Sequence, residues 1–147
     1  MVETRNLIHS LIPLYLMYLA GGKLKGRTRL QKLVFLAQRK LDDETDFGFV
    51  KGWYGPVSYK LLEVVQNLTE TGLIEERTGE TKGGFEVAEY QLTKAGRNFI
   101  DLALNKHMMP QKTRSKVEEA FEEYGRLPFI KMLDKVHTDY PEWVEGS

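Results

Sequence analysis

The stretch WYGPVSYKLLEVVQNLTETGLI, residues 53–74, predicts a helix whose two ends are both marked by the sequence. Pro56 has the fixed φ angle that suits the first position of a helix, and Ser58 is an alternative N-cap two residues later. Gly72 can adopt the left-handed conformation that ends a helix. Between these ends, apolar residues recur at helical spacing and predict one buried stripe: Val57, Leu61, Val64, Val65 and Leu68.

The other face of this predicted helix is polar and carries Tyr59, Lys60, Glu63, Gln66, Asn67 and Glu70. After Gly72 the chain continues with LIEERT, turns in the glycine-rich run GETKGG and returns with FEVAEYQL, a pattern that predicts a β-hairpin. A helix that leads directly into a hairpin is typical of the third, groove-entering helix of a winged helix-turn-helix.

The residues before this stretch predict two further helices. The first covers the region from Asn6 or Ser10 to Leu19, and Pro13 is expected to break it or to mark its start. Because it is apolar almost all round, we expect it to be sandwiched or to form a subunit interface. A basic linker follows, and the second helix runs from about Thr28 to Leu41. The side chains expected outside it are Arg29, Lys32 and Arg39.

Residues 47–54 predict a short strand or an extended segment that leads into the organising helix. After the hairpin, Thr93 can cap a helix that fades near Pro110. A basic linker at residues 112–116 then leads to a helix that Gly125 breaks, and a last helix starts at residues 127–136. The predicted fold class is α+β and mainly α: a winged helix-turn-helix over residues 1–106, with a hairpin wing and a C-terminal helical extension, residues 107–147, packed on it.

Charge is balanced overall but unevenly distributed. The chain of 147 residues has 21 basic and 21 acidic residues, a net charge of zero, so its bulk charge does not indicate nucleic-acid binding. Within residues 23–40, however, there are seven basic residues and no acidic one. Such a patch on a neutral protein can dock phosphates or an acidic protein partner.

Two motifs resemble those of a known family. Residues 30–38, LQKLVFLAQ, and residues 54–57, YGPV, resemble the paired motifs of the Panacea antitoxin domain and of related small bacterial and archaeal proteins. The ending VHTDYPE, residues 136–142, is similar to the tail of several of those proteins. The resemblance implies binding to a toxin protein and implies no catalytic residue. Separately, residues 68–74 followed by YQLTKAG, residues 90–96, resemble the wing of transcription regulators.

The leading functional prediction is a DNA-binding transcriptional regulator that acts as a homodimer in the cytoplasm. Amide side chains can contact adenine edges and lysine can reach guanine, while basic residues beside the helix neutralise phosphates. Helix one and the C-terminal helices would supply the dimer interface. The predicted double-stranded DNA contacts are Lys23, Lys25, Arg27, Arg29, Lys32, Ser58, Tyr59, Lys60, Gln66, Asn67, Arg77 and Lys82.

An alternative prediction is a protein-binding adaptor or antitoxin-like module that uses the same fold without contacting DNA. It rests on the net charge of −1 over residues 56–72 and of −3 over the hairpin, because a wing that lies along phosphates is usually basic. The polar side chains of the organising helix would then be a solvated face.

Catalysis, a metal site, a cofactor and a membrane partner are not expected. The chain has no cysteine, and His9, His107 and His137 are far apart and lack helical metal-ligand spacing. The glycines of the hairpin tip lack the strand-to-helix context of a phosphate-binding loop. The apolar run LIPLYLMYLA, residues 11–20, is too short for a membrane span, and a secretory signal is not favoured.

Overall fold

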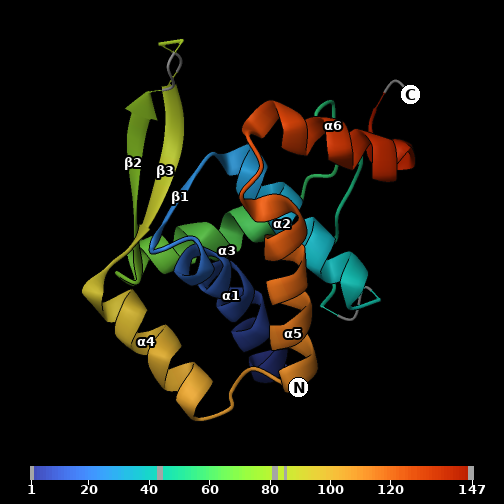
Figure 1. The fold of residues 1–147 in the computed structure, drawn as a ribbon. Helices are drawn as coiled ribbons and strands as arrows, with labels where there is room; N and C mark the ends of the chain where they lie inside the picture. Colours follow the sequence, from blue (N-terminus) through green and yellow to red (C-terminus); the bar gives the residue numbers. More distant parts are fainter. Residues whose placement is uncertain (1, 43–44, 81–82, 85, 146–147) are drawn as a thin grey trace.

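The computed structural model describes residues 2–42, 45–80, 83–84 and 86–145. Its elements are α1 (Val2–Leu19), β1 (Lys23–Lys25), α2 (Arg27–Lys40), α3 (Tyr59–Glu70), β2 (Ile74–Glu80), β3 (Glu86–Leu92), α4 (Lys94–Asn105), α5 (Gln111–Ala120), the π-helical turn η1 (Phe121–Gly125), α6 (Phe129–Asp139) and the 3-10 turn η2 (Pro141–Trp143). The fold is α+β and mainly helical, as predicted (Figure 1).

The strands form an antiparallel sheet in the order β1-β3-β2. The predicted hairpin pairs Ile74 with Leu92 at its base and Glu80 with Glu86 near its tip. Figure 1 shows β2 and β3 projecting beyond the helices. The succession α1-β1-α2-α3-β2-β3 follows the element order predicted from the sequence, with β1 added, and the winged helix-turn-helix stays a prediction.

β1 lies in the segment that was expected to be a basic linker. Lys23 pairs with Gln91 and Lys25 with Glu89, while Leu24 between them is buried. The strand was missed because a three-residue run has no periodicity to detect, and its pairing partner lies more than 60 residues away in β3.

α1 passes through Pro13 without ending, so the predicted break is wrong. Its residues 11, 12 and 14–17 are buried, and packing on several sides of the helix compensates for the hydrogen bond that proline removes. These side chains lie in the core of one chain, against α3, α4 and α5. The expectation that this part of helix one supplies a dimer interface is therefore wrong, and the homodimer stays a prediction.

α2 is buried around its circumference from residue 30 to residue 38, and that burial includes Gln31, Lys32 and Gln38. Lys32 is only 1% exposed, so the prediction that it lies outside is wrong. The physical reason is that the segment between α2 and α3 folds back over the helix and covers its polar side chains.

The C-terminal helices join the same core. α5 begins at Gln111, so the residues predicted as a basic linker are helical. Val117 and Phe121 pack with the α1 and α2 side chains, and Val136 of α6 belongs to the same cluster. No helix in the described part of the chain is long and apolar enough to cross a membrane.

Candidate functional site

α3 presents its polar side outward from a fixed start. The helix begins at Tyr59 and not at Pro56, with Ser58 as its N-cap. The Ser58 hydroxyl accepts a hydrogen bond from the Leu61 amide (3.0 Å) and donates one to the Phe47 carbonyl (2.6 Å). The buried stripe consists of Leu61, Val64, Val65 and Leu68. The polar side chains predicted opposite it, from Tyr59 to Glu70, are exposed.

The polar side chains of α2 hold the segment that leads into α3. The Gln31 amide oxygen accepts a hydrogen bond from the Ser58 main-chain N–H (2.7 Å), and its amide nitrogen donates to the Ser58 carbonyl (3.0 Å). Two turns further on, the Gln38 oxygen accepts from the Phe47 amide (2.6 Å). One helix therefore anchors both ends of residues 47–58.

Lys32 anchors the middle of this segment. Its ammonium group donates to the Pro56 carbonyl (2.9 Å), and burial lowers the pKa of Lys32 to about 8. Gly55 lies directly over the lysine stem: a Cβ added there would lie 3.1 Å from the Lys32 Cε, and φ at this glycine is +105°. The turn therefore requires glycine at this position both for its backbone conformation and for space.

The chain's own tail braces the same segment from the other side. The Glu145 amide donates to the Gly52 carbonyl (2.9 Å), and Val144 forms a parallel bridge with Gly52. The ring of Trp143 lies edge-on to that of Phe35 in α2, with centroids 5.1 Å apart. Residues 47–54 are thus an extended segment with isolated bridges instead of a full strand.

Two large aromatic side chains stand at the exposed tip of this turn. Trp53 is 72% exposed and Tyr54 is 65% exposed. The adjoining first turn of α3 adds Tyr59, which is 68% exposed. We call the four residues Trp53, Tyr54, Tyr59 and Lys60 the aromatic tip. It is displayed on backbone that hydrogen bonds hold in place.

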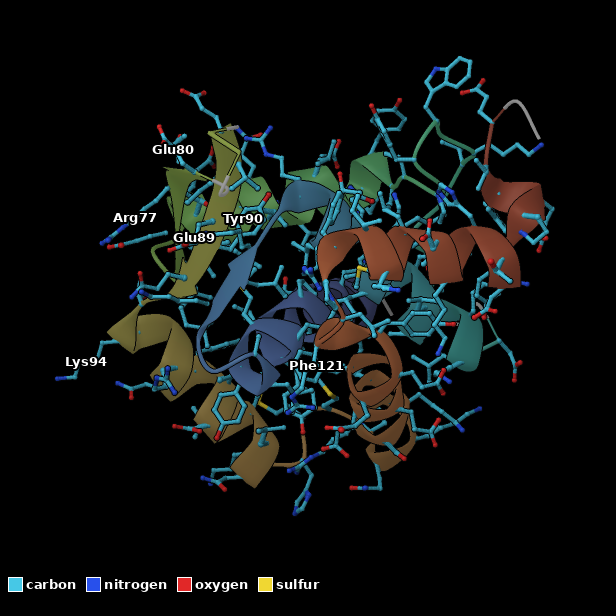
Figure 2. All side chains as sticks on the ribbon, turned by 45° about the horizontal axis from the view of Figure 1, so that its top comes forward. Arg77, Glu80, Glu89, Tyr90, Lys94 and Phe121 are labelled. Atoms are coloured by element: carbon cyan, nitrogen blue, oxygen red, sulfur yellow. The ribbon has the colours of Figure 1, made fainter. Side chains whose placement is uncertain are left out.

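The wing is acidic, and its arginine is paired within the chain. Glu75, Glu76, Glu80, Glu86 and Glu89 belong to β2 and β3, whereas Arg77 is the one basic residue of these two strands. Arg77 pairs with Glu75 (3.0 Å), and Arg27 of α2 pairs with Glu76 (3.1 Å). Figure 2 shows Arg77, Glu80 and Glu89 along the hairpin.

A groove of about 370 Å³ separates α3 from the wing. Its lining includes Leu62 and Val65 from α3 and Tyr90 from β3. Burial raises the pKa of Tyr90 to about 12, and the negative charge of Glu76 acts in the same direction. The phenol therefore stays neutral at physiological pH.

The residues predicted to contact DNA differ in their exposure. Those exposed on α3 are Tyr59, Lys60, Gln66 and Asn67, and those exposed elsewhere are Lys23, Lys25, Arg27 and Arg77. Arg29 is partly buried and donates to the carbonyls of Gly125 and Leu127. Lys82 lies outside the described residues.

The predictions that Lys32 and Ser58 contact DNA are wrong. Both side chains are buried and engaged with main-chain groups of the chain itself, so neither can contact DNA in this structure. Sequence reasoning missed that Gln31, Lys32 and Gln38 act as anchors. The signal was present, because three long polar side chains interrupt an otherwise apolar nine-residue run.

The histidines do not come together. His9 lies inside α1 and is buried, with its Nε2 against the Thr45 carbonyl, so it is not the helix-start residue that was expected. Over the described residues, no group of three or more His, Asp or Glu side chains is arranged to hold a metal ion. The absence of catalysis stays a prediction.

Comparison with known proteins assigns no family. No family model matches the chain, and no curated protein matches it either. The solved structure of the "putative transcriptional regulator TA0346 from Thermoplasma acidophilum" is similar to this chain with a TM-score of 0.45 and 20% sequence identity, over 79% of this chain and 95% of that chain. The resemblance to the Panacea antitoxin domain therefore stays a prediction.

Proposed function

We propose that this chain is a protein-binding module whose partner docks on the aromatic tip and on the adjoining exposed face of α3. The observation that carries the proposal is the pair Trp53 and Tyr54, exposed on a turn that buried side chains of α2 fix from beneath. Exposed aromatic clusters are typical of protein-binding sites, where tryptophan and tyrosine contribute most of the binding energy.

The anchoring of the turn favours this use. A binding surface that is already ordered loses less conformational entropy when its partner arrives. The hydrogen bonds from Gln31, Lys32 and Gln38 order the backbone of residues 47–58 in the unbound chain. Binding then has to immobilise only the exposed side chains.

The charge of the surrounding surface favours a basic protein over a nucleic acid. The acidic side chains of the wing and of α3 outnumber the basic ones, and Arg27 and Arg77 are already paired with glutamates. A surface with a net excess of acidic side chains repels the phosphates of DNA. A partner with lysine and arginine around an apolar centre is complementary to this face.

The test is a pull-down from native extract in which protein and nucleic acid are scored together. We expect the wild-type chain to retain a specific protein that the double variant Trp53→Ala, Tyr54→Ala loses. Ile130→Ala is the matched control, because Ile130 is 66% exposed on α6, outside the aromatic tip. Equal retention by both variants would refute the proposed docking face.

A DNA-binding regulator is the second candidate. The observation that favours it is the helix α3 that leads into a hairpin, together with three exposed side chains of α3, Lys60, Gln66 and Asn67, that suit base edges. A mobility-shift assay on its own upstream region at two salt concentrations tests this candidate. Binding that weakens with salt and loses sequence preference in Gln66→Ala would support DNA. We expect the chain to act in the cytoplasm under either function.

A further inference from the structure

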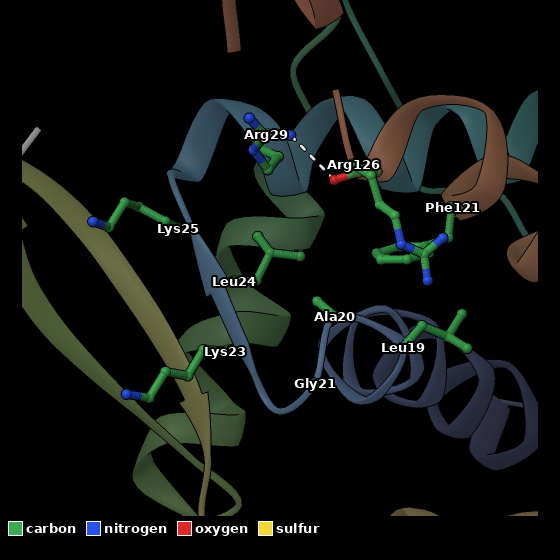
Figure 3. A pocket seen from close by; sticks show the side chains of 10 residues that line it. Leu19, Ala20, Gly21, Lys23, Leu24, Lys25, Arg29, Phe121 and Arg126 are labelled. Atoms are coloured by element: carbon green, nitrogen blue, oxygen red, sulfur yellow. Dashed lines mark hydrogen bonds between the residues drawn. The ribbon is translucent and has the colours of Figure 1, made fainter. Parts of the chain in front are cut away.

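A pocket of about 490 Å³ lies at the junction of α1, β1 and the π-helical turn η1, away from the aromatic tip. Its size is within the range of small-molecule sites. The apolar part of its lining comes from Leu19, Ala20, Leu24 and Phe121. Figure 3 shows Leu24 directed from β1 toward Ala20, on the side of the strand where the pocket lies.

The charged part of the lining is entirely basic. Lys23, Lys25, Arg29 and Arg126 contribute to it, and none of the described residues that line the pocket is acidic. In Figure 3 the side chains of Lys23 and Lys25 extend from the opposite side of β1. They therefore add positive potential, and the two guanidinium groups come from α2 and from the end of η1.

Arg29 is held in place without a counter-ion in these contacts. It donates to the main-chain carbonyls of Gly125 (3.3 Å) and Leu127 (2.8 Å), and burial lowers the pKa of its guanidinium. A carbonyl accepts a hydrogen bond but does not neutralise a full positive charge. Both of these bonds use Nη1, which leaves the donors of Nε and Nη2 for another acceptor.

The opposite wall is built by an irregular turn. Residues 121–125 form a π-helix, a rare conformation that is frequently found at functional sites. It places the Arg126 guanidinium over the ring of Phe121, 4.9 Å from the centroid. Arg126 also pairs with Glu122 (3.0 Å), but both side chains are mostly exposed, and such a surface pair is weak enough for a bound anion to displace. Gly125 is required for this packing, because an added Cβ would lie 2.5 Å from the Phe121 Cδ1.

We propose that this pocket binds a small organic anion, a carboxylate or a phosphate ester with an apolar body. The anionic group would lie between Arg29 and Arg126, where charge-assisted hydrogen bonds are strong. The apolar body would cover Leu24, Ala20 and Phe121. This site is independent of the proposed protein docking, since it shares no residue with the aromatic tip.

The test is isothermal titration of the full chain with octanoate and octyl phosphate, and with octanol and inorganic phosphate as comparison ligands. We expect saturable binding at one site per chain for at least one of the two amphipathic anions, and the tighter one identifies the class. Octanol lacks the charge and inorganic phosphate lacks the apolar body, so both should bind at least about tenfold more weakly.

Two variants locate the site. Arg126→Gln removes an exposed charge and should weaken binding about tenfold, the loss expected for one charge-assisted hydrogen bond. Ala20→Leu fills the pocket while all four cations remain, and should abolish binding at an unchanged thermal midpoint. Arg77→Gln, an exposed arginine on the wing, is the matched control and should bind as the wild type does.

Three results would overturn the proposal. The first is no saturable binding of either amphipathic anion, and the second is binding of octanol as tight as that of octanoate. The third is an affinity that Arg126→Gln and Arg77→Gln change equally.

Discussion

The turn at residues 52–56 and the hairpin of β2 and β3 both present exposed side chains, yet they are built in opposite ways. Side chains of α2 hold the turn from beneath, and Lys32 reaches the carbonyl of Pro56. The wing is held by the ladder between β2 and β3, and most of its side chains on β2 are exposed. The difference shows that anchoring of the backbone is a separate property from accessibility of the side chains.

The largest effect is expected from Gln31→Leu. The substitution leaves the buried N–H of Ser58 without a partner and removes one of the two hydrogen bonds that its C=O accepts, so we expect a loss of about 3 kcal/mol in the free energy of unfolding. Urea denaturation measures it. Gln66→Ala, on the exposed side of α3, is the control and should change stability by less than about 0.5 kcal/mol. Equal losses would show that the turn is no better anchored than the surface.

A pair of glycine substitutions compares the two loops directly. Gly55→Ala places a methyl group against the Lys32 stem at φ +105°, whereas Gly84→Ala at the wing tip has φ +80° and no atom within 4 Å. In both variants the new alanine adds backbone strain of about 1–2 kcal/mol, because its φ angle is positive. The Gly55 variant should lose more, by about 1 kcal/mol, since the neighbouring lysine has to move. A larger loss at Gly84, measured by thermal unfolding, would contradict this contrast.

The buried lysine predicts a pH dependence. The pKa of Lys32 is about 8 in the folded chain, below the ordinary lysine value, so the unfolded chain binds more protons between those two values. Stability contributed by this residue should therefore rise as pH increases from about 8 to about 10, by about 2 kcal/mol. The measurement is the difference in unfolding free energy between wild type and Lys32→Met over that range. A difference that stays constant with pH would show that burial does not lower the pKa of Lys32.

The smallest effect on stability is expected from the aromatic tip itself. Trp53 and Tyr54 are mostly exposed, so Trp53→Ala and Tyr54→Ala should each change the unfolding free energy by less than about 0.5 kcal/mol. Thermal unfolding checks this. A loss above about 1 kcal/mol would assign these rings to packing and would weaken the case for a docking face.

Local signals were sufficient for most elements. The Ser58 and Thr93 caps, the Gly72 stop and the hairpin all depend on residues close in sequence, and the structure confirms them. The order of elements followed from these signals. The α+β, mainly helical class was therefore predictable from the sequence alone.

Long-range packing decided what the sequence did not reveal. Lys32 is buried because the chain returns over α2 more than 20 residues later, which periodicity in one helix cannot indicate. Arg29 is partly buried because Gly125 and Leu127 approach it from the C-terminal part of the chain. The exposure of each residue predicted to contact DNA depends on these distant segments. The formation of the helices that carry these residues does not.

Attachment of residues 47–58 to α2 at Gln31 and Gln38 has an evolutionary consequence. The number of residues between these anchors and their main-chain acceptors is constrained, because an insertion would shift a donor away from its acceptor. The identities at positions 53 and 54 are not constrained in this way. Under the proposed docking function, substitution of these two side chains changes the choice of partner while the spacing beneath them stays the same.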